Sequence, residues 1–167
     1  MPRFFPGRLV LVVTAFFIIL CAGCGSVISK EVRDQVNPDL AFAEVVKNPE
    51  NFQGEMVIFS GDIIDSVNTP AGTRLVVLQR PTDQLGRPIS GDRSQGRFIA
   101  LDGRYLDVAI FSPGRQVTVA GVLAAPETWP LGEIQYKYPV LDVKEIYLWH
   151  PYPPADFRFG ISFQQSF

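Results

Sequence analysis

An apolar run at the N-terminus decides which part of this chain is left to fold. Residues 9–20, LVLVVTAFFIIL, contain Thr14 as their only polar side chain, and Arg3 and Arg8 precede them without any acidic residue. A basic start, a short apolar run and small residues at its end are typical of a secretory signal peptide. The run is shorter than the roughly 20 residues that a membrane-spanning helix needs. We therefore predict a signal peptide over residues 1–23, which leaves 144 of the 167 residues to fold.

The only two cysteines of the chain, Cys21 and Cys24, stand at the end of this run. A zinc site would need a second pair of ligands, and the single histidine, His150, lies far downstream. A redox C-x-x-C pair belongs in a βαβ unit rather than in a signal peptide. The sequence AGC, residues 22–24, resembles the end of a bacterial lipobox. It implies that Cys24 carries diacylglycerol and an N-acyl chain, because a thiolate is the strongest side-chain nucleophile near neutral pH. We predict no other cofactor and no metal site.

The lipid anchor has consequences for location. One acyl chain holds a protein only marginally, whereas two or three chains make release from a bilayer rare. Gly25 follows the acceptor, where an aspartate commonly retains lipoproteins of Gram-negative bacteria in the inner membrane. The lipobox resemblance therefore implies an outer-membrane location.

Composition limits the classes of partner. Without Arg3 and Arg8 the chain has 13 basic and 17 acidic residues, a formal charge of −4. This balance does not attract phosphate backbones, so we expect no nucleic-acid partner. The 14 glycines, 14 prolines and 13 phenylalanines favour a β-rich body with many turns.

We divide the mature chain into a tether (24–38), a β-rich domain (39–150) and a tail rich in proline and aromatic residues (151–167). A short helix is predicted near residue 40, capped by Asn37, with Pro38 as its first residue. Leu40, Ala43 and Val46 would share its buried face.

Five strands are predicted at residues 55–67, 73–81, 97–103, 114–125 and 140–150, with a loop or an edge hairpin at 128–139. Gly61, inside the first strand, predicts a bulge or a tight barrel corner. In the fifth strand, Leu141, Val143, Tyr147 and Trp149 would share one face. The pattern predicts a mostly β fold: a small, partly open, OB-like barrel of about five strands with one short N-terminal helix. A β-sandwich is the alternative.

Several unusual strings occur together between residues 52 and 150. They are FQGEMVIFSGDI, LVVLQRPTDQLGRP, SQGRFIA, LDVAIFSPGRQVTVAG, GEIQYKYPVL and LWH. In this order they resemble the Slp family of outer-membrane lipoproteins, which is associated with starvation or stress responses. The resemblance implies an outer-membrane location in a Gram-negative bacterium. It transfers one residue role, the lipidation of Cys24, and no catalytic residue.

Two further segments are candidate interaction sites. Arg80, Arg87, Arg93 and Arg97 form a possible patch for an anion or a partner, because guanidinium groups bind carboxylates and phosphates. The alternative is a solvated loop shaped by Asp–Arg pairs.

In the tail, Phe157, Phe159 and Phe163 alternate with polar or small residues. These aromatic side chains could contact an outer-membrane protein partner by adding a strand to its sheet. The alternatives are that the tail folds back over its own domain or is disordered.

We predict no enzymatic activity, because the chain lacks a G-x-S-x-G motif to accompany His150. The sequence favours a lipid-anchored, periplasm-facing structural or interaction protein of the cell envelope. The alternative function is a periplasmic module that binds a small ligand or a glycan on the barrel.

Overall fold

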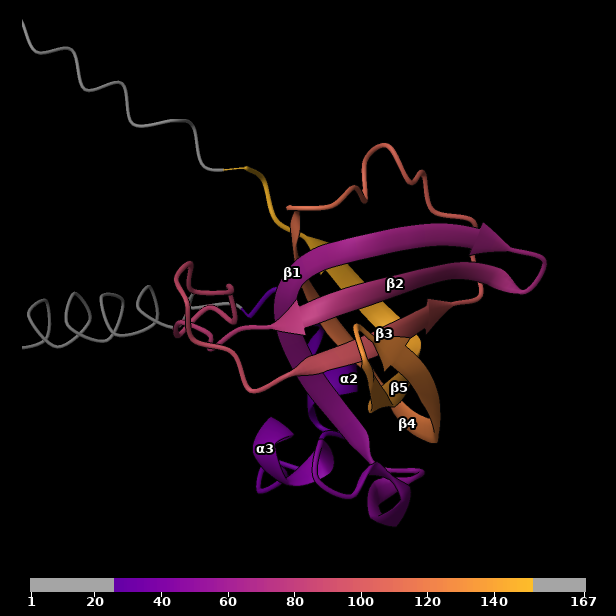
Figure 1. Cartoon of the computed structure of the whole chain (residues 1–167). Coiled ribbons are helices and arrows are strands. Elements are labelled where there is room, and N and C mark those ends of the chain that lie inside the picture. Colours follow the sequence, from indigo (N-terminus) through magenta and orange to yellow (C-terminus); the bar gives the residue numbers. More distant parts are fainter. Residues whose placement is uncertain (1–25, 152–167) are drawn as a thin grey trace, which may run out of the picture.

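The computed structural model describes residues 26–151 (Figure 1), so Cys24 and the tail phenylalanines lie outside the described residues. The strands are β1 (Met56–Thr69), β2 (Gly72–Gln79), β3 (Arg97–Asp102), β4 (Gln116–Leu131) and β5 (Ile134–Leu148). They form one closed barrel in the order β1-β2-β3-β5-β4. The predicted mostly β, OB-like barrel of five strands is therefore confirmed, and the ring is closed where the sequence predicted partial opening.

Strand β1 helps to close the ring because it pairs with two strands, β4 and β2. Residues 56–62 pair with β4, and residues 61–69 pair with β2, so the two ladders overlap at Gly61 and Asp62. A Cβ atom on Gly61 would lie 2.0 Å from the carbonyl oxygen of Leu78. The predicted corner is thus a point of close backbone approach, which only glycine permits.

The remaining seam joins β3 and β5. These strands run parallel, and three residue pairs hold them together, with Ile99–Leu101 opposite Val140–Asp142. All other neighbouring strands in the ring are antiparallel. The segment predicted as a loop or edge hairpin is a hairpin, because β4 and β5 continue to pair up to Leu131 and Ile134. Gly132 takes the positive φ of 62° in its turn.

The inward side chains of all five strands form one apolar core with the helix before β1. Its buried members are Phe42, Val45, Val57, Phe59, Ile63, Leu75, Val77, Phe98, Ala100, Val117, Val119, Leu123 and Leu141. The ring of Phe42 lies 4.9 Å from that of Phe59 and 6.0 Å from that of Phe98, each in an edge-on arrangement. The helix therefore closes one end of the barrel with an aromatic cluster.

A β-bulge in β5 changes one predicted face. Gly121 pairs with Val143 and Ala120 pairs with Glu145, which leaves Lys144 as the extra residue. Beyond this bulge Ile146 and Leu148 pack against the core, and Tyr147 lies opposite Thr118 on the outside. The prediction that Tyr147 and Trp149 share a face with Leu141 and Val143 was wrong, because a single extra residue inverts the alternation.

The helical segments also differ from the prediction. Helix α3 (Phe42–Val45) begins after Ala41, and a 3-10 helix η1 (Pro49–Phe52) follows it. Asn37 is not its cap; the Asn37 side chain accepts a hydrogen bond from the backbone N–H of Asp39.

The segment predicted as a tether is partly packed on the barrel. It contains helix α2 (Lys30–Arg33), and Ile28 is only 1% exposed. Both the backbone N–H and the hydroxyl of Ser29 donate to the carboxylate of Glu145 on β5, at 3.0 and 2.8 Å. The described part of this segment, from residue 26, is therefore not a free linker.

We expect Gly61→Ala to destabilise the barrel by about 3 kcal/mol, because the new methyl group overlaps a backbone carbonyl that cannot move without breaking a ladder. Urea unfolding followed by circular dichroism measures the change. The matched control is Gly103→Ala, since no atom lies within 4 Å of a Cβ there. An equal effect of both substitutions would contradict the close approach.

Candidate functional site

The connection between β2 and β3, residues 80–96, folds over the outside of the barrel, and we call it the arginine loop. Its Gly86 carbonyl accepts hydrogen bonds from Ser60 on β1 (3.2 Å) and Thr118 on β4 (2.7 Å). The indole N–H of Trp149 donates to the same Thr118 hydroxyl at 2.9 Å. The predicted polar loop is thus fixed on the sheet, because buried hydroxyls on the outer face require partners.

The side chain of Arg80 links this loop to β1. Its Nε donates to the Asp62 carboxylate at 2.7 Å, and its Nη1 donates to the backbone carbonyls of Gly91 and Arg93. The side chains of Arg80 and Asp62 are only 14% and 25% exposed. A guanidinium held on several sides in this way supports the loop.

The other three predicted arginines have different surroundings. The guanidinium of Arg87 lies 5.2 Å from the ring centre of Trp149 and donates to the carbonyl of His150 at 3.0 Å. Arg93 is exposed and lines a separate hollow of about 520 Å³. Arg97 opens β3, where its backbone N–H donates to the Tyr136 hydroxyl. The arginines therefore do not share one set of contacts, and an anion-binding or partner-binding role stays a prediction.

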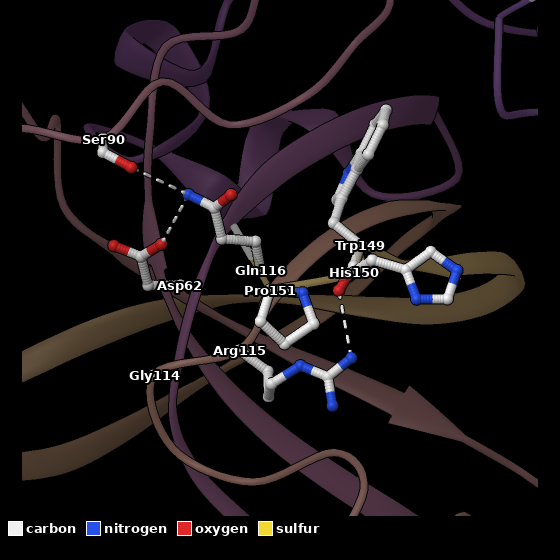
Figure 2. Close-up of a pocket in the computed structure, with 8 residues that line it drawn as sticks. All are labelled: Asp62, Ser90, Gly114, Arg115, Gln116, Trp149, His150 and Pro151. Atoms are coloured by element: carbon white, nitrogen blue, oxygen red, sulfur yellow. Dashed lines mark hydrogen bonds between the residues drawn. The ribbon is translucent and has the colours of Figure 1, made fainter. Parts of the chain in front are cut away.

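A pocket of about 340 Å³ opens beside the arginine loop (Figure 2). It is lined by Asp62, Ser90, Gly114, Arg115, Gln116, Trp149, His150 and Pro151. Gln116 donates to Asp62 (3.3 Å) and to Ser90 (3.4 Å) on one wall. On the other wall, Arg115 donates to the carbonyl of Trp149 at 3.0 Å. The Asp62 carboxylate, which also pairs with Arg80, and the Arg115 guanidinium both line this pocket.

Sequence reasoning missed Asp62, Arg115 and Gln116 as pocket residues. Asp62 and Gln116 are 54 positions apart in the chain and meet only because β1 and β4 pair. No local pattern could have indicated this contact. Across residues 26–151, no three His, Cys, Asp or Glu side chains group closely enough to hold a metal ion. In the same part of the chain, no helix has the length and apolar character needed to cross a membrane.

A second surface lies at the β1–β2 turn and the loop after β3. Four large apolar side chains are exposed there: Val67, Tyr105, Val108 and Ile110. The loop is held to the turn, because the Tyr105 hydroxyl donates to the Pro70 carbonyl and the Asn68 amide donates to that of Leu106. We call these four side chains the apolar rim.

Asp102 supports the loop after β3, which carries Tyr105, Val108 and Ile110 of the apolar rim. Its carboxylate accepts hydrogen bonds from the backbone N–H and the guanidinium of Arg104 at 2.7 to 2.9 Å. Burial raises the pKa of Asp102, but the hydrogen bonds and the charge of Arg104 outweigh burial, so that the pKa lies below its usual value. The resulting stability is present above the unfolded pKa, near pH 4, and is lost as pH falls through the folded pKa.

The fold and these surfaces define a class: a small closed OB-like barrel whose N-terminal segment is fixed on its outer wall. Comparison with known proteins supplies the family. The model of the outer membrane lipoprotein Slp family matches residues 21–164, and the chain belongs to this family. The family resemblance predicted from the sequence is confirmed.

Three relatives show the same relationship. The uncharacterized lipoprotein YeaY of Escherichia coli is 28% identical over 134 residues, which cover 80% of this chain and 69% of YeaY. The outer membrane protein Slp of Escherichia coli is 25% identical over 133 residues, covering 78% of this chain and 70% of Slp. An uncharacterized protein of Haemophilus influenzae is 24% identical over 155 residues, covering 86% and 82%. The names of these relatives state no enzymatic activity.

Among solved structures, the small single-stranded DNA-binding protein from Streptomyces coelicolor matches at 18% identity and a TM-score of 0.35. The matched region covers 56% of this chain and 92% of the DNA-binding protein. The barrel is assigned from the strand pairings of this chain and not from that match.

We expect Arg80→Ala to lower the free energy of unfolding by about 2 kcal/mol, because Asp62 and two loop carbonyls lose their donor. Hydrogen exchange should quicken in residues 87–93. Arg93→Ala, on the same loop, is the control and should change the free energy by less than about 0.5 kcal/mol. Unchanged exchange in the Arg80 variant would show that the loop is held by other contacts.

Asp102→Asn should cost about 1 kcal/mol at neutral pH, a small value because the guanidinium of Arg104 is largely solvated. The cost should shrink as pH falls below about 4, since the wild-type carboxylate is then protonated as well. Urea unfolding at a series of pH values measures both effects, and Asp92→Asn serves as the exposed control. A cost that is independent of pH would contradict the pairing with Arg104.

Proposed function

We propose that the protein is a structural or interaction module of the outer membrane, anchored by lipid at Cys24 and facing the periplasm. The observation that carries the proposal is the family match, which begins at residue 21 and so includes the AGC sequence. A part in starvation or stress responses belongs to the same proposal and is supported by the family resemblance alone. The proposal also includes that the protein has no enzymatic activity.

The short distance between the anchor and the barrel supports this proposal. Four residue steps separate Cys24 from the buried Ile28, and a fully extended chain spans about 14 Å over them. Beyond Ile28, Ser29 is bonded to Glu145 on β5. A lipid on Cys24 would therefore keep the barrel wall close to the leaflet surface.

A second candidate function is the binding of a small polar ligand or a glycan. The pocket beside the arginine loop supports it, because polar side chains of Asp62, Arg115 and Gln116 line one hollow. A ligand that binds only the folded state raises the melting temperature. A thermal-shift screen of envelope metabolites, repeated with Gln116→Leu, tests this function, and a flat response across the screen would contradict it.

The tail belongs to the interaction proposal. Phe157, Phe159 and Phe163 would contact an outer-membrane protein partner, and removal of residues 151–167 should release such a partner during co-purification. Unchanged co-purification after the removal would eliminate the tail from the proposal.

The central test is lipidation. Cys24→Ser should abolish acylation and move the protein from the outer-membrane fraction to soluble fractions or to an unprocessed form, because serine cannot form the thioether. Intact mass spectrometry with membrane fractionation measures both results. Cys21→Ser is the matched control, and its mature product should have the wild-type mass, since residue 21 is removed with the signal peptide.

Gly25→Asp tests the membrane assignment separately. This variant should be acylated but retained in the inner membrane. Wild-type protein without acyl chains, together with outer-membrane sedimentation of the Cys24→Ser variant, would overturn the proposed anchor.

A further inference from the structure

We propose that the arginine loop is a membrane-contact surface, in which Leu85 and Ile89 enter the lipid leaflet and Arg93 faces the phosphates of the headgroups. The proposal rests on the proposed anchoring at Cys24 and adds an orientation to it. The barrel would then lie against the bilayer by a defined side rather than rotate freely on its anchor.

The loop presents its apolar side chains in a fixed shape. Leu85 is 46% exposed and Ile89 is 42% exposed. The Asp83 carboxylate accepts hydrogen bonds from the backbone N–H groups of Leu85 (2.8 Å) and Arg87 (2.9 Å). The N–H of Ile89 donates to the Pro81 carbonyl at 2.8 Å. These bonds hold the loop in place, so both side chains stay available to an apolar partner.

This loop lies on the same outer wall as the N-terminal segment. Ser29 is bonded to Glu145, which pairs with Ala120 on β4. Gly86 of the loop is bonded to Thr118, two residues from Ala120 and on the same face of that strand. Two residues along a strand span roughly 7 Å. The loop and the first described residues are therefore neighbours, and Figure 1 shows both on one side of the barrel.

Charge distinguishes this surface from the rest of the protein. The arginine loop, residues 80–96, contains three arginines and two aspartates, a local charge of +1 within a mature chain of −4. The Asp83 carboxylate accepts hydrogen bonds from N–H groups of the loop, whereas the Arg93 side chain is exposed. Basic side chains beside apolar ones suit the surface of a leaflet that contains anionic lipids.

The apolar rim is the competing surface, and its position excludes it from this role. Val67 pairs with Arg74 of β2, beyond the part of β1 that pairs with β4. The rim thus lies on the projecting hairpin and the loop after β3, and not on the wall that carries Ser29. At 48% exposure, Val67 is a matched control for Leu85.

The test measures contact with lipid directly. The mature chain, beginning at Cys24, is coupled through this thiol to a maleimide phospholipid in vesicles of phosphatidylethanolamine, phosphatidylglycerol and brominated phosphatidylcholine. No other cysteine follows Cys24 in the chain, so the coupling is selective. The anchor then does not depend on acylation in the cell, and failure of the proposed lipidation remains distinguishable from failure of this surface.

Tryptophan is introduced by Leu85→Trp in one variant and by Val67→Trp in the other, with Trp129 and Trp149 as a common background. We expect the bromine atoms to quench the Leu85→Trp signal at least threefold more than the Val67→Trp signal. Near-ultraviolet circular dichroism confirms that both variants fold. Equal quenching, stronger quenching of Val67→Trp, or quenching of Leu85→Trp no greater than the background would overturn the proposal and leave the loop to a protein partner.

A second measurement uses the chain without any lipid. In a Cys24→Ser background, the double substitution Leu85→Asp and Ile89→Asp should weaken partition into the same vesicles by about tenfold, because two half-exposed aliphatic groups no longer enter the leaflet. The substitution Val67→Asp with Val108→Asp should leave partition unchanged. Equal losses in the two double variants would contradict the assignment of the arginine loop.

Discussion

The barrel depends on the close approach of β1 to β2 at Gly61. At this residue β1 still pairs with β4 and already pairs with β2, so two ladders share one short stretch of backbone. A side chain at position 61 would occupy the place of the Leu78 carbonyl. Because the glycine leaves this space open, β1 can bend across the barrel and complete a ring whose last seam is the short parallel pair of β3 and β5.

Ring closure creates an outer wall that also has to be covered. Ser60 and Thr118 point outward and are nevertheless buried, with Gly86 of the arginine loop as their acceptor. Next to them, Ser29 is fixed on Glu145. The loop and the N-terminal segment therefore meet on one wall as a consequence of satisfying polar groups there, and this meeting underlies the proposed orientation on the membrane.

Much of the fold could be predicted from local patterns. Alternation placed all five strands, and glycine 61 indicated the corner, because strand period and glycine chemistry are properties of short segments. The start of α3 was missed because packing of Phe42 on Phe59 decides it, and tertiary contacts override capping signals. The faces of Tyr147 and Trp149 were missed because the bulge at Lys144 depends on the pairing with Ala120 and Gly121.

By itself the sequence determined the β-rich class, the family resemblance and the position of the cysteine that the lipobox resemblance marks for lipid. These conclusions rest on patterns within a few residues, or on strings that recur in a family. Only the tertiary structure decided that Arg80 pairs with Asp62 and that Gln116 donates a hydrogen bond to Asp62. It also decided that the arginine loop lies beside Ser29. The physical reason is that each of these contacts joins distant strands or segments, and strand pairing in a closed ring sets which side chains meet.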